Sequence, residues 1–204
     1  MSTNRTIKAE GNAQAAGALQ RPDDYQPPLS ITLPEILRNG SDSAFRELIW
    51  QLLVVAKRIH KYPEIFGHRI GISSAQYTVL IATAHMQGSE GIGIRALADY
   101  IHLPAPHITT TVGLLVNAGL LAKRQNPEDG RGVLVSMTEA GDAALRELAP
   151  FQQQINDELF DGLSRADFAT FTRLVGKLVG NTQRAFDKAD ALQQTNIAPR
   201  KVAK

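Results

Sequence analysis

The sequence contains no cysteine and no long apolar run. Without cysteine the chain cannot form a disulfide, a thiolate nucleophile, a cysteine zinc site, an iron–sulfur cluster or a thiol redox sensor. Its apolar runs are far shorter than the ~20 residues that a membrane-crossing helix needs. The first 30 residues also lack the basic tip and apolar stretch of a secretory signal. We therefore expect a cytoplasmic protein.

The sequence also has little net charge. Its 22 Lys and Arg residues against 20 Asp and Glu residues give +2, which does not indicate a nucleic-acid partner by itself. A hydrophobic content of 43% over 204 residues suits one globular domain with extensions and excludes a wholly disordered chain. The basic excess lies in residues 41–89 and 181–204. Any DNA binding would therefore depend on a few individual Lys and Arg side chains at the contact surface.

The first half of the chain has mostly helical periodicity. Residues 1–30 lack periodicity, and we expect a flexible arm there. The apolar spacing from Ala44 to Tyr62 predicts a helix that Pro63 ends. Ser73 and Gln76 have capping-box spacing at the start of another helix. Helices over 94–101 and from Pro106 to just before Gly119 have the lengths of a helix-turn-helix.

After Gly119 the apolar period changes from helical to alternating. Residues 121–124 and 133–137 are expected strands, with turn residues at 126–130 between them. Thr138 is expected to cap a long helix, and Ser164 and Asp167 the last helix, which is followed by a tail from about Ala189.

Three stretches, 95–99, 112–121 and 126–141, resemble the multiple-antibiotic-resistance regulator (MarR) family of winged-helix repressors. The family pattern is a Leu-Ala helix, a recognition helix ending in Gly-Leu, and a wing reading Asp-x-Arg, then Val-x-Leu-Thr-x-x-Gly. The residues that fit the wing pattern are Asp129, Arg131, Val135, Thr138 and Gly141, with Met137 in place of Leu. The resemblance covers roughly residues 42–188, and the wing is its most specific part.

The resemblance implies a mainly α fold with a small β-hairpin wing (α+β), a winged helix-turn-helix with a helical dimerisation region. The implied division is a flexible arm (1–30), an N-terminal helical part of the dimerisation region (31–72), a DNA-binding winged helix (73–140), C-terminal dimerisation helices (141–188) and a flexible basic tail (189–204). The implied function is a ligand-responsive transcriptional regulator, most simply a repressor, without enzymatic activity or cofactor. It would bind a pseudo-palindromic operator as a homodimer and leave it when a small ligand such as an aromatic acid or thioester binds.

The expected DNA-binding residues lie in the recognition helix and the wing. They are Pro106, His107, Thr109, Thr110, Thr111, Lys123, Arg124 and Arg131. Arg131 would enter the minor groove, Lys123 and Arg124 would contact phosphates, and the threonines would contact bases or phosphates. For Arg131 the alternative is a solvated turn residue or one paired with Asp129. For Lys123 and Arg124 it is a solvated strand edge, and for the threonines it is packing and capping. The family commonly has arginine where Thr110 stands.

Aromatic and cationic residues cluster around the junction of the first two expected helices, where the family tends to bind small ligands. They are Trp50, His60, Tyr62, Phe66, His68, Arg69 and Tyr77. Aromatic walls and a cation suit an aromatic carboxylate, and ordinary core packing is the alternative. His60 and His68 lack the spacing of a helical metal pair, so we expect no metal site.

Two other functions compete with a regulator. A winged-helix protein-interaction module with weak or no specific DNA binding fits the uncharged recognition helix. The hypothesis of a small enzyme lacks support, because the sequence shows no nucleophile elbow, phosphate loop or carboxylate pair at a telling spacing. Residues 91–96, Gly-Ile-Gly-Ile-Arg-Ala, match a dinucleotide fingerprint only formally, because an expected helix, and not a strand, precedes them.

Overall fold

The computed structural model describes residues 27–127 and 132–194. The chain divides between His60 and Lys61 into two units, and each is described here by itself. Most of the expected arm and part of the expected tail lie outside the described residues, as do Asp129 and Arg131. None of the described helices has the length and apolar composition needed to cross a membrane.

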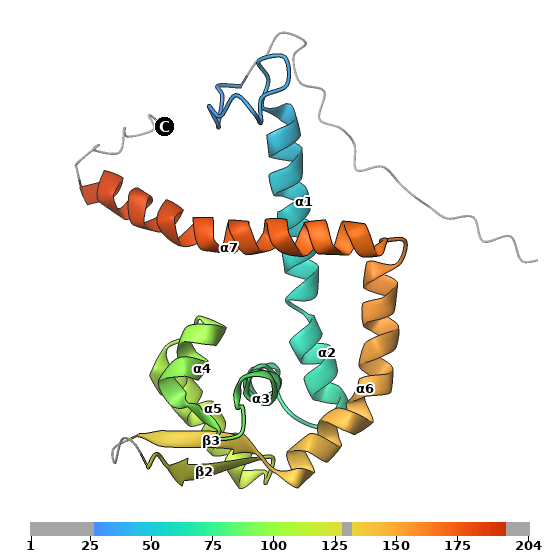
Figure 1. The fold of residues 1–204 in the computed structure, drawn as a ribbon, viewed down its shortest axis with the longest axis vertical. Helices are drawn as coiled ribbons and strands as arrows, with labels where there is room; N and C mark the ends of the chain where they lie inside the picture. The colour runs from blue at the N-terminus through green and yellow to red at the C-terminus, as the bar shows by residue number, and fades with distance from the viewer. Residues whose placement is uncertain (1–26, 128–131, 195–204) are drawn as a thin grey trace, which may run out of the picture. The chain divides into compact units, whose positions relative to one another are not determined.

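The first unit contains α1 (Ser43–Ile59). The elements of the second unit are α2 (Tyr62–Arg69), α3 (Ser74–Met86), β1 (Ile92–Gly93), α4 (Ile94–Ile101), α5 (Ala105–Asn117), β2 (Leu121–Gln125), β3 (Val133–Met137), α6 (Glu139–Phe160) and α7 (Arg165–Gln194) (Figure 1). The described chain is thus mainly helical with one small antiparallel sheet, as the sequence predicted.

In the first unit, a buried carboxylate ties the segment before α1 to the start of that helix. The Ser30 backbone N–H and hydroxyl donate to Asp42 Oδ2 at 2.7 and 2.6 Å, and Arg46 Nε donates to Asp42 Oδ1 at 3.0 Å. Arg46 also donates to the Pro28 carbonyl at 2.6 Å. The hydrogen bonds from Arg46 and Ser30 hold the pKa of Asp42 well below its ordinary value, because they stabilise the carboxylate.

Two helix boundaries differ from the sequence-based expectation. Pro63 does not end a helix over 44–62, because α1 ends at Ile59 and Pro63 lies in the first turn of α2. A proline is favourable in a first turn, where its missing N–H needs no partner. At the other end of the chain, α7 continues to Gln194, so residues 189–194 are helical and not part of a tail.

The core of the second unit lies among α3, α4, α5 and the sheet. Its fully buried side chains include Leu80, Leu97, Ile108, Leu115 and Val135. The capping box predicted for α3 is confirmed: the Ser73 hydroxyl accepts from the Gln76 N–H, and the Gln76 side chain accepts from the Ser73 N–H. The bounds predicted for the next helix, 94–101, are those of α4.

The sheet has the antiparallel order β1-β3-β2, and the sequence did not predict β1. Gly91, just before β1, has a φ of +80°, and a Cβ there would lie 2.8 Å from the Val135 carbonyl oxygen. Glycine is therefore required where the chain passes over β3. The antiparallel pairing of β1 differs from the parallel βαβ unit of a dinucleotide fingerprint, and the first glycine of the Gly-x-Gly sequence, Gly91, serves this close approach.

Candidate nucleic-acid interface and pocket

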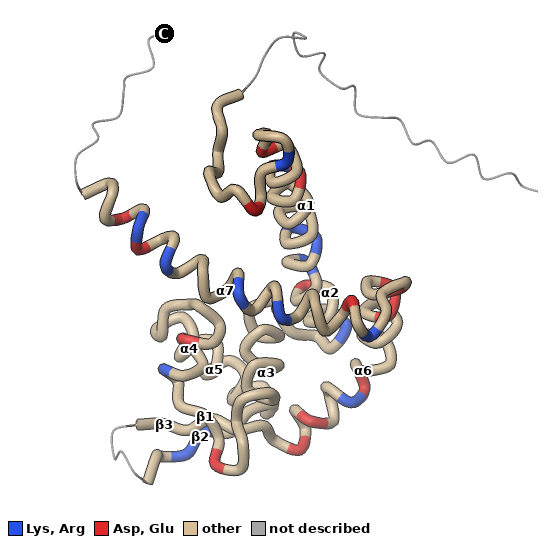
Figure 2. The backbone as a smooth tube through the Cα atoms, turned by 45° about the horizontal axis from the view of Figure 1, so that its top comes forward, with Lys and Arg blue, Asp and Glu red and all other residues tan. Residues whose placement is uncertain are grey.

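Helix α5 presents an exposed, uncharged surface at its N-terminal end. A tight turn leads into it from α4, with His102 in the left-handed conformation at φ 58° and Pro106 in the first turn. Ile108 and Val112 are fully buried and hold α5 against the core. Figure 2 shows neither a basic nor an acidic residue on α5. In the first two turns of α5 the exposed side chains are Pro106, His107, Thr109 and Thr110.

The threonine hydroxyls of α5 bond back to the helix itself. Thr109 donates to the Ala105 carbonyl at 2.9 Å, and Thr110 donates to the Pro106 carbonyl at 3.1 Å. Their oxygens keep lone pairs that can accept, and their methyl groups remain available for apolar contact. Thr111 was expected among the exposed residues, and this was wrong: it is only 4% exposed, because it lies on the core face of α5.

The two cations of β2 are in different situations. Arg124 Nη2 donates to Glu90 Oε2 at 2.6 Å and to the Glu90 carbonyl at 2.7 Å, so its guanidinium already has a partner in the loop before β1. The Lys123 side chain is exposed and forms no ion pair within residues 27–127 and 132–194. Arg131, the residue expected in the minor groove, lies outside the described residues.

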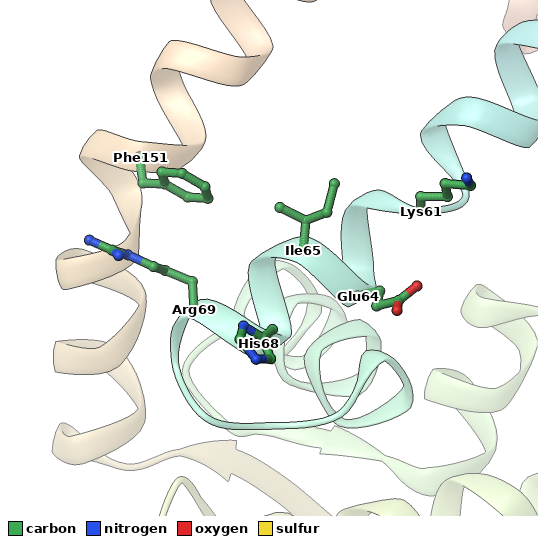
Figure 3. Close-up of a pocket in the computed structure, with 6 residues that line it drawn as sticks. All are labelled: Lys61, Glu64, Ile65, His68, Arg69 and Phe151. Atoms are coloured by element: carbon green, nitrogen blue, oxygen red, sulfur yellow. The ribbon is translucent and has the colours of Figure 1, made fainter.

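A pocket of about 550 Å³ opens between α2 and α6 (Figure 3). Its lining residues are Lys61, Glu64, Ile65, His68, Arg69 and Phe151. The Arg69 guanidinium lies 5.3 Å from the centre of the Phe151 ring, a cation–π contact. The pocket thus combines two cations and one carboxylate with an apolar wall.

The structure separates the residues that the sequence had grouped around a ligand. His68 and Arg69 line the pocket. Phe66 and Tyr77 are buried in the core beside it, and Tyr62 packs edge-on against Phe66 at 5.5 Å between ring centres. The other two expected ligand residues, Trp50 and His60, belong to the first unit.

An aromatic cluster connects the pocket wall to α3. The Phe66 ring lies 6.3 Å from the Phe151 ring and 5.6 Å from the Tyr77 ring. Gln152 donates to the Tyr77 hydroxyl at 3.2 Å, and burial raises the pKa of Tyr77. Phe151 is therefore one packed ring away from the helix against which α5 lies.

Sequence reasoning missed four lining residues of the pocket: Lys61, Glu64, Ile65 and Phe151. The first three lie with His68 and Arg69 at i, i+3, i+4, i+7 and i+8, the spacing of one helical face. This signal would have been visible had Pro63 been interpreted as the start of a helix. No group of three His, Asp or Glu side chains in the described part of the chain is arranged to hold a metal.

Comparison with known proteins agrees with this architecture. The sequence model of the MarR family matches residues 70–132, from the end of α2 into the hairpin. An uncharacterized HTH-type transcriptional regulator of Bacillus subtilis, YwhA, is 26% identical over 85 residues, which span 42% of this chain and 61% of that protein.

Solved structures show the same fold. A MarR-family regulator from Rhodococcus sp. RHA1 is 18% identical, with a TM-score of 0.57, over 68% of this chain and 96% of that one. CouR from Rhodococcus jostii RHA1, solved with p-coumaroyl-CoA bound, is 19% identical, with a TM-score of 0.58, over 68% of this chain and 95% of that one. Residues 70–132 thus match the MarR family, and the described chain has the winged helix-turn-helix fold of solved MarR-family regulators.

Proposed function

We propose that the protein is a non-enzymatic regulator that binds a pseudo-palindromic operator as a homodimer and acts as a repressor until a small anionic ligand releases it. The observation that carries this proposal is the exposed N-terminal surface of α5, held on a rigid core and followed by a hairpin with an exposed lysine. This is the placement of a recognition helix and wing in DNA-binding proteins of this fold.

The exposed side chains of α5 are suited to contact base edges in the major groove without a charged group. The Thr109 and Thr110 hydroxyls can accept from the amino groups of adenine or cytosine, and their methyl groups can contact the thymine methyl. Because the helix lacks a cation, a phosphate contact would come from Lys123, and Arg131, which lies between β2 and β3 in the sequence, would enter the minor groove.

Uncovered apolar helix surfaces support the homodimer. Neither α1 nor α7 has a buried residue, and both carry exposed large apolar side chains. On α7 these include Phe168, Phe171, Leu174, Val175, Leu178 and Val179, which are spaced as one helical face. A hollow of about 430 Å³ opens among Leu163, Phe171 and Leu174. A second copy would cover these surfaces and set two α5 helices about one DNA turn, ~34 Å, apart.

The pocket between α2 and α6 is the proposed ligand site. Lys61 and Arg69 would pair with a carboxylate or phosphate, and Ile65 and Phe151 would pack on an apolar or aromatic part. An aromatic acid or its thioester has both features. Because Phe151 contacts Phe66, which contacts Tyr77 of α3, an occupied pocket could alter the position of α5, for which ~1–3 kcal/mol of coupling is enough.

Binding to the DNA upstream of the protein's own and neighbouring genes, titrated with salt, tests the proposal. Sequence-specific binding with a steep salt dependence, released by one of several pools of aromatic acids and thioesters, is the expected result. Specific binding that no pool releases would support the proposed DNA binding and contradict the proposed ligand class. Absence of specific binding at low salt would favour a winged-helix protein-interaction module.

A further inference from the structure

We propose that Arg124 is a positioning residue: paired with Glu90, it clamps β2 to the loop that leads into β1 and fixes the direction of the β2–β3 wing toward DNA. This inference rests on the DNA binding proposed above. It assigns Arg124 a role different from the phosphate contact expected from the sequence.

The register of the sheet puts the clamp across the middle strand. Arg124 of β2 and Gly93 of β1 both pair with Leu134 of β3, from opposite sides. Glu90 lies three residues before Gly93, and Arg124 Nη2 reaches both its side-chain Oε2, at 2.6 Å, and its carbonyl oxygen, at 2.7 Å. One guanidinium therefore joins β2 to the loop that leads into β1.

The pairing of β1 with β3 is short, although Ile92 of β1 is buried in the core. The strand has only two residues, and each pairs once with β3. At the end of β3 nearer α6, Gln87, which follows α3, accepts from the Met137 N–H at 2.7 Å and ties β3 to α3. The Arg124–Glu90 pair lies toward the other end of the sheet, nearer the connection between β2 and β3.

Lys123 and Arg124 lie on opposite faces of the sheet, because successive residues of a strand alternate. Lys123 pairs with Val135, whose side chain is fully buried on the face toward the helices, so Lys123 shares that face. Arg124 lies on the other face and is neutralised by Glu90. A neutral pair gains little from a phosphate, so we assign the phosphate contact to Lys123 alone.

The direction in which Glu90→Gln changes DNA affinity distinguishes a positioning role of Arg124 from a phosphate contact. Glu90→Gln removes a negative charge near DNA. If Arg124 contacted a phosphate and Glu90 only weakened that contact, the variant would bind DNA more tightly. The clamp predicts weaker binding, by about two- to fivefold for an exposed ion pair. Arg124→Gln should weaken binding equally, and the double variant should be no weaker than either single variant. The probe is a duplex that the full-length protein selects from a random-sequence pool. Tighter or unchanged binding of Glu90→Gln would overturn the proposal.

The salt dependence of binding supplies the matched control. Lys123→Gln should reduce the slope of log K against log salt by about 0.9, as loss of one phosphate contact does. Arg124→Gln should leave the slope of the wild-type protein unchanged. A slope reduced equally by both variants would make Arg124 a phosphate contact and refute the clamp.

Hydrogen exchange tests the clamp without DNA. Glu90→Gln should accelerate exchange of the β1 amides and their partners in β3, while α4 amides keep the wild-type rate. Unchanged exchange in β1 and β3 would refute the clamp. If the wild-type protein selects no duplex, the proposed function is wrong, and hydrogen exchange still shows whether the Arg124–Glu90 pair holds the sheet together.

Discussion

At the scale of single residues, neighbouring threonines of α5 have different roles. Thr110 is exposed, whereas Thr111 is buried, and both hydroxyls bond within the helix. Thr110→Val removes an exposed acceptor and keeps the side-chain shape. We expect it to reduce discrimination between the selected duplex and single-base variants by about 1 kcal/mol, roughly fivefold, in competition binding.

Thr111→Val is the matched control for Thr110→Val. It also removes one hydroxyl, whose bond is to the His107 carbonyl at 2.9 Å, but on the face that packs into the core. Discrimination should remain at the wild-type level. An effect of Thr111→Val as large as that of Thr110→Val would mean that the variants act through the stability of α5 and not through base contact.

Asp42 makes the segment before α1 sensitive to acid. Because its pKa is lowered in the folded protein, its contribution to stability is present above the ordinary value of 3.8 and is lost as pH falls through the lowered value. We expect an NMR titration of its carboxyl group to give a midpoint well below 3.8. Arg46→Ala, which removes the largest cause of the shift, should raise that midpoint; an ordinary midpoint in the wild-type protein would show that the segment is not tied down.

At the scale of elements, two helical glycines have opposite surroundings. A Cβ at Gly141, in the first turn of α6, would lie 2.2 Å from the Leu120 carbonyl oxygen, whereas a Cβ at Gly113 of α5 would meet nothing within 4 Å. Gly141→Ala should lower the free energy of unfolding by about 2 kcal/mol or more, because backbone must move. Gly113→Ala should stabilise by up to ~1 kcal/mol.

Thermal unfolding of both glycine variants measures this difference. If Gly141→Ala left the free energy of unfolding unchanged, α6 could shift away from the end of α5 without loss of stability. The start of α6 would then not fix the position of this helix relative to the hairpin. The comparison also explains why glycine fits the family's Thr-x-x-Gly pattern at this position. Thr138 caps the helix by accepting from the Gly141 N–H at 3.0 Å, and the same glycine lets the chain pass Leu120.

Elements with local signals were predictable from the sequence. The Ser73 capping box and the cap at Thr138 depend on residues three apart, and both are confirmed. Pro63 was misinterpreted because a proline is compatible both with the end of one helix and with the first turn of the next. The winged-helix order was thus predictable, whereas one boundary between helices was not.

The site was less predictable, because its parts meet only in three dimensions. Phe151 is more than 80 residues from α2, and no local pattern places it against Arg69. Glu90 and Arg124 are 34 residues apart, and β1, which brings them together, is too short to give an alternating pattern. The exposed surface of α5 was mostly predictable from helical periodicity, except for buried Thr111.

At the scale of the whole molecule, the proposed dimer should control DNA binding. Phe171 lies on the apolar face of α7 and lines the hollow there, and Lys177 lies about 120° around that helix from Phe171 by its spacing. Because Phe171 is 45% exposed in a single chain, Phe171→Glu should leave each subunit folded. It should bury a charge in the dimer and produce monomers in sedimentation velocity runs at concentrations where the wild-type protein is dimeric.

Lys177→Glu introduces the same side chain six residues away and should remain dimeric. The two variants should also differ in operator affinity, because two linked half-sites bind far more tightly than one. The effective concentration of a second linked site raises overall affinity by ~10²–10⁴, so monomeric Phe171→Glu should lose about that factor, whereas Lys177→Glu should not. A Phe171→Glu protein that stays dimeric would place the dimer interface elsewhere. A monomeric Phe171→Glu protein with wild-type affinity would show that one α5 helix and its wing are sufficient, and that the operator need not be palindromic.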